Sequence, residues 1–418
     1  MTNGKSAQAP ARLADAIAAP DNFPSLGTRL PRRIWLPLLL LLVASIPWRR
    51  GAYFSGGLDT VVIAKAALTV VAASLALPNG ALPRRAVPAA PFVLLGLYLT
   101  ISAFGAWMYG DLIPTLALVM RVGLAAVVVY CLLSSFDTAG VLMGLARGML
   151  VVGGFAAVTG LPTLSSGRLS GGLPPIAPNE IAILCGVPFI VLFWRAVYVG
   201  RSRLDVLLLV ALAVTVYATA SRTGIALLVA ATLLALIRAR HLRAIVVVMA
   251  AASAPLLAYV FAYTDVFAGF LDRGGTGNTA TLNSRTIAWT AAAELAQDWL
   301  QHLFGAGMSR KIIAVTGQYW STQTLDSTWV STLVQAGYLG LVLLVGLIVY
   351  GARGVAFVPG PLSVLLAVLL FFSVGRSILE SGMMDASSGF LTFFVLVTAA
   401  GAVRLQRNRL TTSRGDRL

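Results

Sequence analysis

Residues 112–134 read LIPTLALVMRVGLAAVVVYCLLS, an apolar run with a single charged residue, Arg121. A helix of about 20 such residues crosses the hydrocarbon core of a bilayer, so this run predicts a transmembrane helix. Because unpaired backbone groups are costly in lipid, uninterrupted apolar runs favour α-helices over the short alternating strands of a membrane barrel. We therefore predict an all-α fold.

Similar runs recur along the whole chain. The 418 residues are 58% hydrophobic and 11% charged, with a mean hydropathy of +0.87, which is far from the composition of a soluble domain. Runs bounded by Gly, Pro and charged residues predict a polytopic membrane protein with about 12 transmembrane helices. The predicted spans are 34–48, 60–78, 88–108, 112–134, 139–159, 180–199, 203–219, 222–237, 242–262, 328–350, 361–375 and 387–403.

The distribution of charge predicts how the chain is oriented. With these spans, most of the 31 Lys and Arg residues fall on the side of the two termini, so we expect both termini to be cytoplasmic. The net charge of +16 then favours contact with anionic lipids over nucleic-acid binding. Arg121 and Arg147 fall within spans, where we expect structural pairing with polar groups of the bundle.

This orientation divides the chain into five predicted segments. Residues 1–33 form a disordered basic cytoplasmic tail without the pattern of a signal peptide, and residues 404–418 form a second basic cytoplasmic tail. Residues 34–262 hold helices 1–9, and residues 328–403 hold helices 10–12. The intervening residues 263–327 form a large outer, periplasmic loop, and connections of this length are usually functional.

One helix is predicted inside the outer loop. From residue 284 to 303 an apolar stripe recurs at helical spacing, and Gly305 and Gly307 end the pattern. Glu294, Asp298 and His302 are spaced four apart on another face of this helix. They form either a solvated helix face or a row that binds an acceptor.

Several arginines are predicted at the outer mouth of the bundle. Arg168, Arg222, Arg285 and Arg376 each stand among small residues, and the arginine fork suits phosphate oxygens. Any one of them can instead extend to lipid headgroups or pair with a carboxylate. Since three of them share small-residue settings on one face, a common anion site is a reasonable hypothesis.

Asp326 is the candidate catalytic carboxylate. It stands before the tenth span, where it can take a proton from a hydroxyl or cap the following helix, and the two roles are compatible. The sequence contains no phosphate-binding Gly-Lys loop, paired-histidine zinc motif or Asp-x-Asp site. We therefore expect a mechanism without metal or cofactor.

Four segments together resemble the bacterial O-antigen ligase and O-antigen polymerase superfamily of membrane glycosyltransferases. Each segment alone is weakly specific, but their order, spacing and common outer side strengthen the resemblance. The segments are GRLSG at 167–171 with PNEIA at 178–182, SRT at 221–223, NSR at 283–285 leading to LFGAG at 303–307, and DSTWVSTLVQAGYLG at 326–340.

The resemblance implies a function at the bacterial inner membrane. The substrates would be a saccharide linked to undecaprenyl diphosphate and a glycan or lipid acceptor, with membrane lipids around the protein. Arg168, Arg222 and Arg285 would bind the diphosphate, with Arg222 and Arg285 also catalytic through the charge that develops as it leaves. Asp326, the third catalytic residue, would activate or orient the acceptor hydroxyl. Asp326 stands where the ligases have a histidine, which favours a polymerase or another sugar transferase over ligation to lipid A core.

A transporter or flippase for lipid-linked saccharides is the alternative of a different class. Such a protein also needs cations in a central cavity, but on broken helices near the midplane and often with repeat symmetry. No repeat is visible in the sequence, and the candidate arginines gather at one mouth. The sequence therefore favours the transferase.

Overall fold

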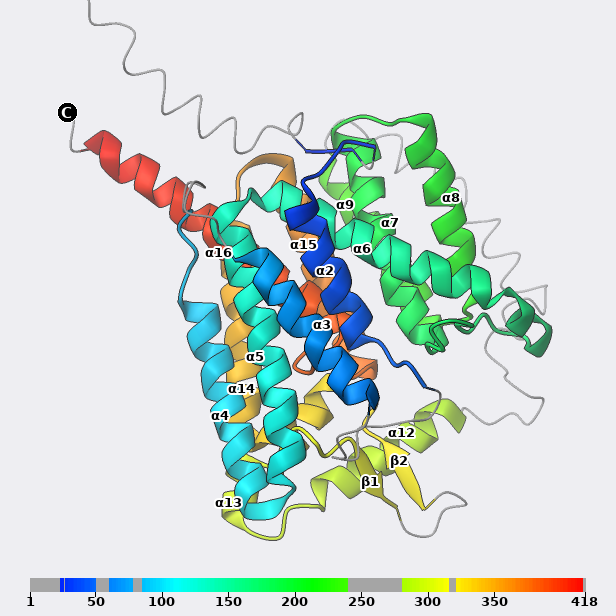
Figure 1. The fold of residues 1–418 in the computed structure, drawn as a ribbon, viewed down its shortest axis with the longest axis vertical. Coiled ribbons are helices and arrows are strands. Elements are labelled where there is room, and N and C mark those ends of the chain that lie inside the picture. The colour runs from blue at the N-terminus through cyan, green and yellow to red at the C-terminus, as the bar shows by residue number, and fades with distance from the viewer. Residues whose placement is uncertain are drawn as a thin grey trace, which may run out of the picture.

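The computed structural model describes residues 23–25, 27–49, 60–77, 85–239, 280–315 and 321–415, and these residues are mostly helical (Figure 1). Its long helices are α2 (Arg32–Ser45), α3 (Thr60–Ala76), α4 (Ala90–Tyr109), α5 (Leu112–Ser135), α6 (Thr138–Thr159), α7 (Pro178–Tyr198), α8 (Arg203–Ala218), α9 (Arg222–Arg238), α12 (Ala280–Ala293), α14 (Thr328–Ala356), α15 (Gly360–Leu379) and α16 (Ser388–Gly415). The short elements are η2 (Leu161–Ser166), α13 (Trp299–Phe304), β1 (Ile312–Ala314) and β2 (Thr322–Thr324).

The helices follow the apolar runs. Every predicted span coincides with a helix except 242–262, which lies outside the described residues, as does most of the predicted N-terminal tail. Within the described residues, seven helices are long and apolar enough to cross a membrane: α4, α5, α6, α7, α14, α15 and the first part of α16. The prediction of a multi-pass helical membrane protein is confirmed, whereas the count of twelve spans and the two cytoplasmic tails stay predictions.

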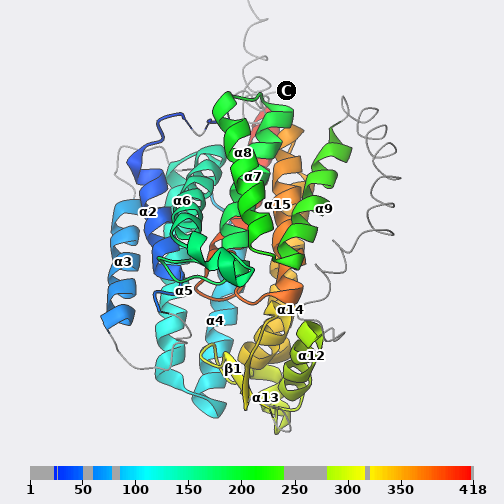
Figure 2. The same ribbon diagram turned by 90° about the vertical axis from the view of Figure 1, so that its right-hand side faces the viewer.

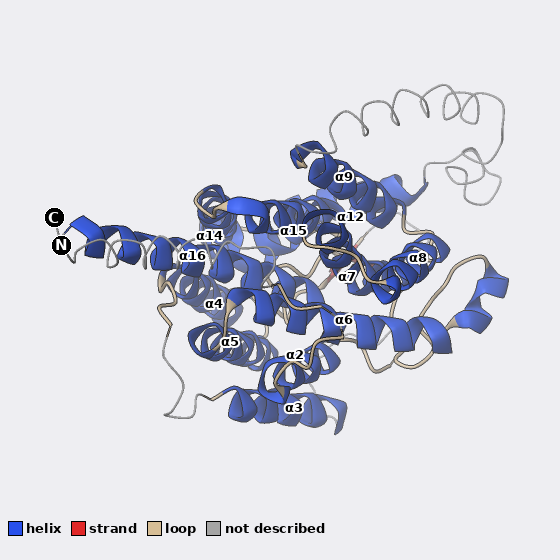
Figure 3. Ribbon diagram, turned by 90° about the horizontal axis from the view of Figure 1, so that it is seen from above, coloured by secondary structure: helices blue, strands red, loops and turns tan. Residues whose placement is uncertain are grey.

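The helices pack side by side (Figures 2 and 3), and α16 contacts α5, α6, α7, α14 and α15. Contacts join α2 to α3 and α6, α4 to α14, α7 to α6 and α8, and α9 to α15. On α16, Phe390, Phe393 and Phe394 are at most 1% exposed, so this helix lies in the centre of the bundle.

The described part of residues 263–327 gathers at the end of the bundle opposite the C-terminal end of α16 (Figures 1 and 2). It contains α12, α13 and an antiparallel pair in which Ile313 of β1 faces Gln323 of β2. This pair was not predicted, because strands of three residues are too short to show an alternating pattern. Ile313 and Leu325 are buried against Ala288 and Val334, and this small apolar cluster holds the pair against α12 and α14.

The prediction of one helix over residues 284–303 is wrong. Helix α12 ends at Ala293, and α13 begins at Trp299. The break has a local cause, because the Asp298 carboxylate accepts a hydrogen bond from the Gln301 amide at 2.8 Å and so caps a new helix. Glu294, Asp298 and His302 therefore do not form a row on one helix face.

A kink in α14 joins two of the motif segments. Gly337 has φ 64° and ψ −162° inside the helix, which frees the preceding carbonyls. The amide of Ala306 donates to the carbonyl of Val334 at 2.7 Å, and the amide of Gly307 donates to that of Gln335 at 3.0 Å. The LFGAG segment is thereby fixed to the middle of the segment that begins at Asp326.

Candidate active site

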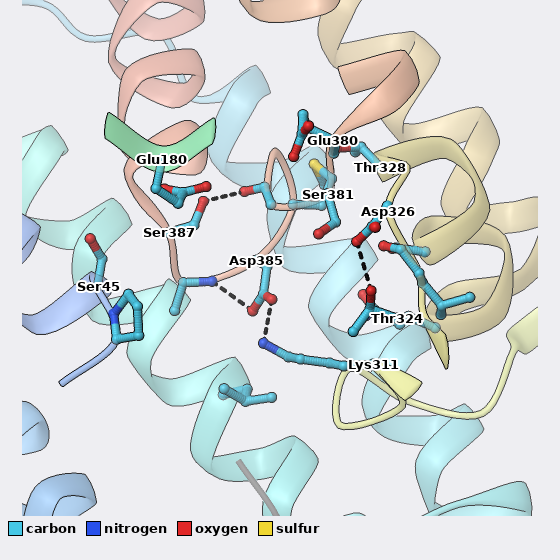
Figure 4. A pocket seen from close by; sticks show the side chains of 18 of the residues that line it. Ser45, Glu180, Lys311, Thr324, Asp326, Thr328, Glu380, Ser381, Asp385 and Ser387 are labelled. Carbon is cyan, nitrogen blue, oxygen red and sulfur yellow. Dashed lines mark hydrogen bonds and ion pairs between the residues drawn. The ribbon is translucent and has the colours of Figure 1, made fainter. Parts of the chain in front are cut away.

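A polar cavity of about 480 Å³ lies where the beginning of α7, the β1–β2 pair, the beginning of α14 and the α15–α16 loop meet (Figure 4). Its other wall comes from the end of α2 and from α3 and α5. Charged side chains of both signs line it: Glu180, Asp326, Glu380, Asp385, Lys65, Arg121 and Lys311. Within the described residues, no group of three or more His, Cys, Asp or Glu side chains is placed to hold a metal ion.

Asp326 lines this cavity from the turn between β2 and α14. The N-cap of α14 is Ser327, so Asp326 does not occupy the capping position that the sequence allowed. One oxygen of Asp326, Oδ1, accepts a hydrogen bond from the Thr324 hydroxyl at 2.9 Å. The carboxylate is thus held at the cavity wall by a single neighbouring side chain of the described structure and faces a space that a substrate can enter.

Glu380, directly after α15, connects three of the motif segments. Its Oε1 accepts hydrogen bonds from the Asn179 amide at 2.5 Å and from the Arg285 guanidinium at 3.4 Å. Its backbone carbonyl accepts from the Thr328 amide at 3.1 Å and from the Thr328 hydroxyl at 2.9 Å. Since Thr328 is two residues from Asp326, Glu380 links the loop arginine to the segment that holds the candidate carboxylate.

The environment of Glu380 makes it harder to ionise. Burial raises the pKa of Glu380 from 4.5 to about 7, while the positive charges of Arg376 and Arg285 lower it and the negative charges of Glu180 and Asp326 raise it. A carboxyl group in this range exchanges its proton near neutral pH, which suits acid–base chemistry.

The other two candidate arginines lie together at one turn of the chain. The Nε of Arg168 donates to the Thr219 carbonyl at 3.1 Å, and the amide of Leu169 donates to the Ala218 carbonyl at 2.9 Å. Arg222 is the first residue of α9, three positions after Thr219. Both arginines therefore lie at the α8–α9 turn, and neither lines the 480 Å³ cavity.

The α8–α9 turn is nevertheless adjacent to the cavity wall. A Cβ on Gly224 of α9 would lie 3.0 Å from the Cβ of Ala182 on α7, and Asn179 and Glu180 at the start of α7 line the cavity. Asp326 thus lines the cavity, Arg285 reaches its wall only through the contact with Glu380, and Arg168 and Arg222 lie at the α8–α9 turn, which packs against α7.

The residues predicted as an acceptor-binding row have separate surroundings. Asp298 caps α13 and accepts a hydrogen bond from the Tyr109 hydroxyl at 2.9 Å, and the amide that it caps lowers its pKa. His302 stacks on Tyr338 of α14, with ring centroids 5.9 Å apart. Glu294 follows the end of α12 and does not line the cavity. Asp298 has a structural role in this arrangement, and acceptor binding stays a prediction.

Two cations on the opposite wall of the cavity donate hydrogen bonds to carbonyls at the C-terminal end of α2. The Lys65 ammonium donates to the Ile46 carbonyl at 2.7 Å, and Arg121 donates to the Ala44 carbonyl at 2.8 Å. Carbonyls at a helix C-terminus lack partners within the helix and carry partial negative charge, so cations stabilise them. Arg147 likewise donates to backbone carbonyls of the N-terminal segment. The structural roles predicted for Arg121 and Arg147 agree with these contacts.

Sequence reasoning missed the partly buried ion pairs beside the cavity. Arg376 is 6% exposed and donates to the Asn179 carbonyl at 2.9 Å and to Glu180 at 3.2 Å. The ammonium of Lys311 pairs with Asp385. The signals were available, because Glu180 belongs to the PNEIA segment and Glu380 follows Arg376 by four residues. Neither signal indicates which distant partner each side chain meets.

Comparison with protein families gives one match, in which residues 207–345 correspond to the family described as O-antigen ligase. Arg222, Arg285 and Asp326 lie within the matched residues, whereas Arg168 and Glu380 lie outside them. Comparison with curated proteins finds no match. In general terms, the family match supports a membrane glycosyltransferase of the O-antigen ligase type. The match supports the placement of this chain in the O-antigen ligase and polymerase superfamily.

Proposed function

We propose that this protein transfers a saccharide from undecaprenyl diphosphate to a hydroxyl of an acceptor glycan or lipid at the outer face of the bacterial inner membrane, without a metal ion. The observation that carries the proposal is the connection of Arg285, through Glu380, to the cavity that Asp326 lines. This cavity is lined in part by the β1–β2 pair, which lies with α12 and α13 at one end of the helical bundle (Figure 1).

The proposed reaction is a displacement at the anomeric carbon of the donor sugar. The acceptor oxygen forms a bond to this carbon, and the bond from the carbon to the diphosphate oxygen breaks. The leaving diphosphate keeps the electron pair, and Arg168, Arg222 and Arg285 would offset its charge. Asp326 would activate or orient the acceptor hydroxyl.

The positions of the arginines set a requirement on the donor. Since Arg285 contacts the cavity wall and Arg168 and Arg222 lie at the α8–α9 turn, the diphosphate must bind between the two places, along the beginning of α7. The polyprenyl chain would then extend along the apolar surface of the bundle. The presence of Asp326 at the histidine position of the ligases favours polymerisation, or another sugar transfer, over ligation to lipid A core.

A reconstituted assay tests the proposal. Purified protein in nanodiscs is incubated with extracted undecaprenyl-diphosphate oligosaccharides in the presence of EDTA, and the products are separated on a gel. Longer saccharides, or transfer to an added acceptor, would support the transferase. Intact donor that moves between the leaflets of proteoliposomes would instead identify a transporter.

Arginine variants test the diphosphate role. We expect Arg222→Ala and Arg285→Ala each to lower the transfer rate by about 10²-fold or more, because each removes a donor from the leaving group. Arg310→Ala is the matched control, since Arg310 is exposed at the same end of the molecule and does not line the cavity. Wild-type polymer length and yield in either of the first two variants would rule out the proposed role.

A further inference from the structure

The side chain of Glu380 is held from one side only. Both of its hydrogen bonds, from Asn179 and from Arg285, go to Oε1. Within the described part of the chain, no donor bonds to Oε2. The residue lines the 480 Å³ cavity together with Asp326 and Ser381 (Figure 4). One carboxylate oxygen is therefore fixed by the protein, and the other is available to a hydroxyl group in the cavity.

The contacts of Glu380 also fix where that oxygen lies. Its backbone carbonyl accepts a hydrogen bond from Thr328 at the start of α14. Its carboxylate accepts hydrogen bonds from Asn179 at the beginning of α7 and from Arg285 of α12. Three elements that are distant in sequence thus determine the position of one side chain, which is 14% exposed. A catalytic group needs this kind of restraint, because a small displacement of a reacting atom is costly in rate.

Resting on the proposed function, we infer that Glu380 is the catalytic base that takes the proton from the acceptor hydroxyl, and that Asp326 orients this hydroxyl. As the acceptor oxygen bonds to the anomeric carbon, its proton passes to the Oε2 of Glu380, and the diphosphate leaves with the electron pair of the broken bond. The proton is released to solvent before the next transfer.

The charged groups around Glu380 match this role. Arg376 of α15 and Arg285 of α12 stabilise its ionised form, whereas burial and the carboxylates of Glu180 and Asp326 favour its protonated form. The opposing effects leave its pKa at about 7. A base with a pKa near the working pH is ionised often enough to act and basic enough to hold the proton.

Glu380→Gln is the decisive variant, because the glutamine side chain has nearly the same shape and its carbonyl oxygen can still accept from Asn179. We expect kcat to fall by about 10²- to 10⁴-fold with little change in KM for the donor. The wild-type kcat should rise as the pH increases through about 7, and this rise should be absent in the variant. Glu380→Asp keeps a base and should retain both part of the rate and the pH dependence.

Controls separate this role from a structural one. Asp111→Asn removes an exposed carboxylate at the start of α5, beside Ser309 of the outer segment, and should keep the wild-type rate. The affinity of Glu380→Gln for the donor is measured directly. If donor binding and kcat were both lost, Glu380 would only hold Arg285 in place, and the inference would be overturned. If Glu380→Gln kept the wild-type kcat and pH dependence, the inference about Glu380 would be overturned and the proposed function would stand. Wild-type protein that transfers no sugar would overturn the proposed function.

Discussion

Replacement of Gly337 by alanine should destabilise the protein strongly, because the backbone and the packing at this position both exclude a side chain. The values of φ 64° and ψ −162° fall in a region that only glycine populates readily, and forcing another residue there costs about 1–3 kcal/mol. An added Cβ would lie 2.2 Å from the Leu303 carbonyl oxygen and 2.5 Å from that of His302. Since both contacts are with backbone, relief requires α13 to move, which adds about 1–3 kcal/mol.

The two effects together predict a loss of about 2–6 kcal/mol in the free energy of unfolding. Gly346→Ala in the same helix is the matched control. A Cβ there would meet only the two methyl carbons of Leu94, each at 3.9 Å, and alanine in a helix interior is more stable than glycine by about 0.5–1 kcal/mol. The control should therefore melt at the wild-type temperature or slightly above it.

Thermal unfolding in detergent micelles, followed by near-ultraviolet circular dichroism, measures both variants under the same conditions. The activity of Gly337→Ala should fall as well, because the amides of Ala306 and Gly307 bond to the carbonyls that the kink frees. Equal melting temperatures for Gly337→Ala and Gly346→Ala would refute the reasoning, since they would show that α13 is not held by the kink.

Three further perturbations test the charged residues. Arg376→Met should cost about 3–5 kcal/mol, because it leaves the Glu180 carboxylate beside the cavity without its cation, and Glu180→Gln in the same protein should restore much of the melting temperature. Arg121→Met should cost about 1–3 kcal/mol in chemical denaturation, since the Ala44 carbonyl loses its donor. The folded-state pKa of about 7 for Glu380 exceeds its ordinary value of 4.5, so wild-type stability should fall as the pH rises between these values. Glu380→Gln should remove that fall, and its melting temperature relative to wild type should be higher at about pH 8 than at about pH 5.

The transmembrane helices were the part of the fold that the sequence predicted best. A run such as residues 112–134 has no alternative to a helix in lipid, and α5 occupies Leu112–Ser135. The outer segment was predicted less well. There the helix break at Asp298 and the pairing of β1 with β2 depend on one capping side chain and a few apolar contacts, which leave little trace in periodicity.

The residues of the candidate site were also predicted only in part. Arg285 and Asp326 were identified from their local settings and from the family resemblance; Asp326 lines the cavity, and Arg285 contacts Glu380 in its wall. Glu380 was not identified, because nothing around it in the sequence indicates that Asn179, 201 positions away, or Arg285, 95 positions away, is its partner. The meeting of Arg168 with the α8–α9 turn was equally hidden, since the hydrogen bond from Arg168 to the Thr219 carbonyl joins residues 51 positions apart.

The family match covers only part of the candidate site. Residues 207–345 supply Arg285 and Asp326 but not the groups that hold them in place. Arg285 donates a hydrogen bond to the Glu380 carboxylate, and Thr328, which follows Asp326 by two residues, donates to the Glu380 carbonyl. The side chain of Asn179 donates a further hydrogen bond to the Glu380 carboxylate. Both supporting residues lie outside the match, one before it and one after it. The matched domain alone therefore lacks part of the site, and the chemistry proposed here depends on contacts between α7, α15 and the outer segment.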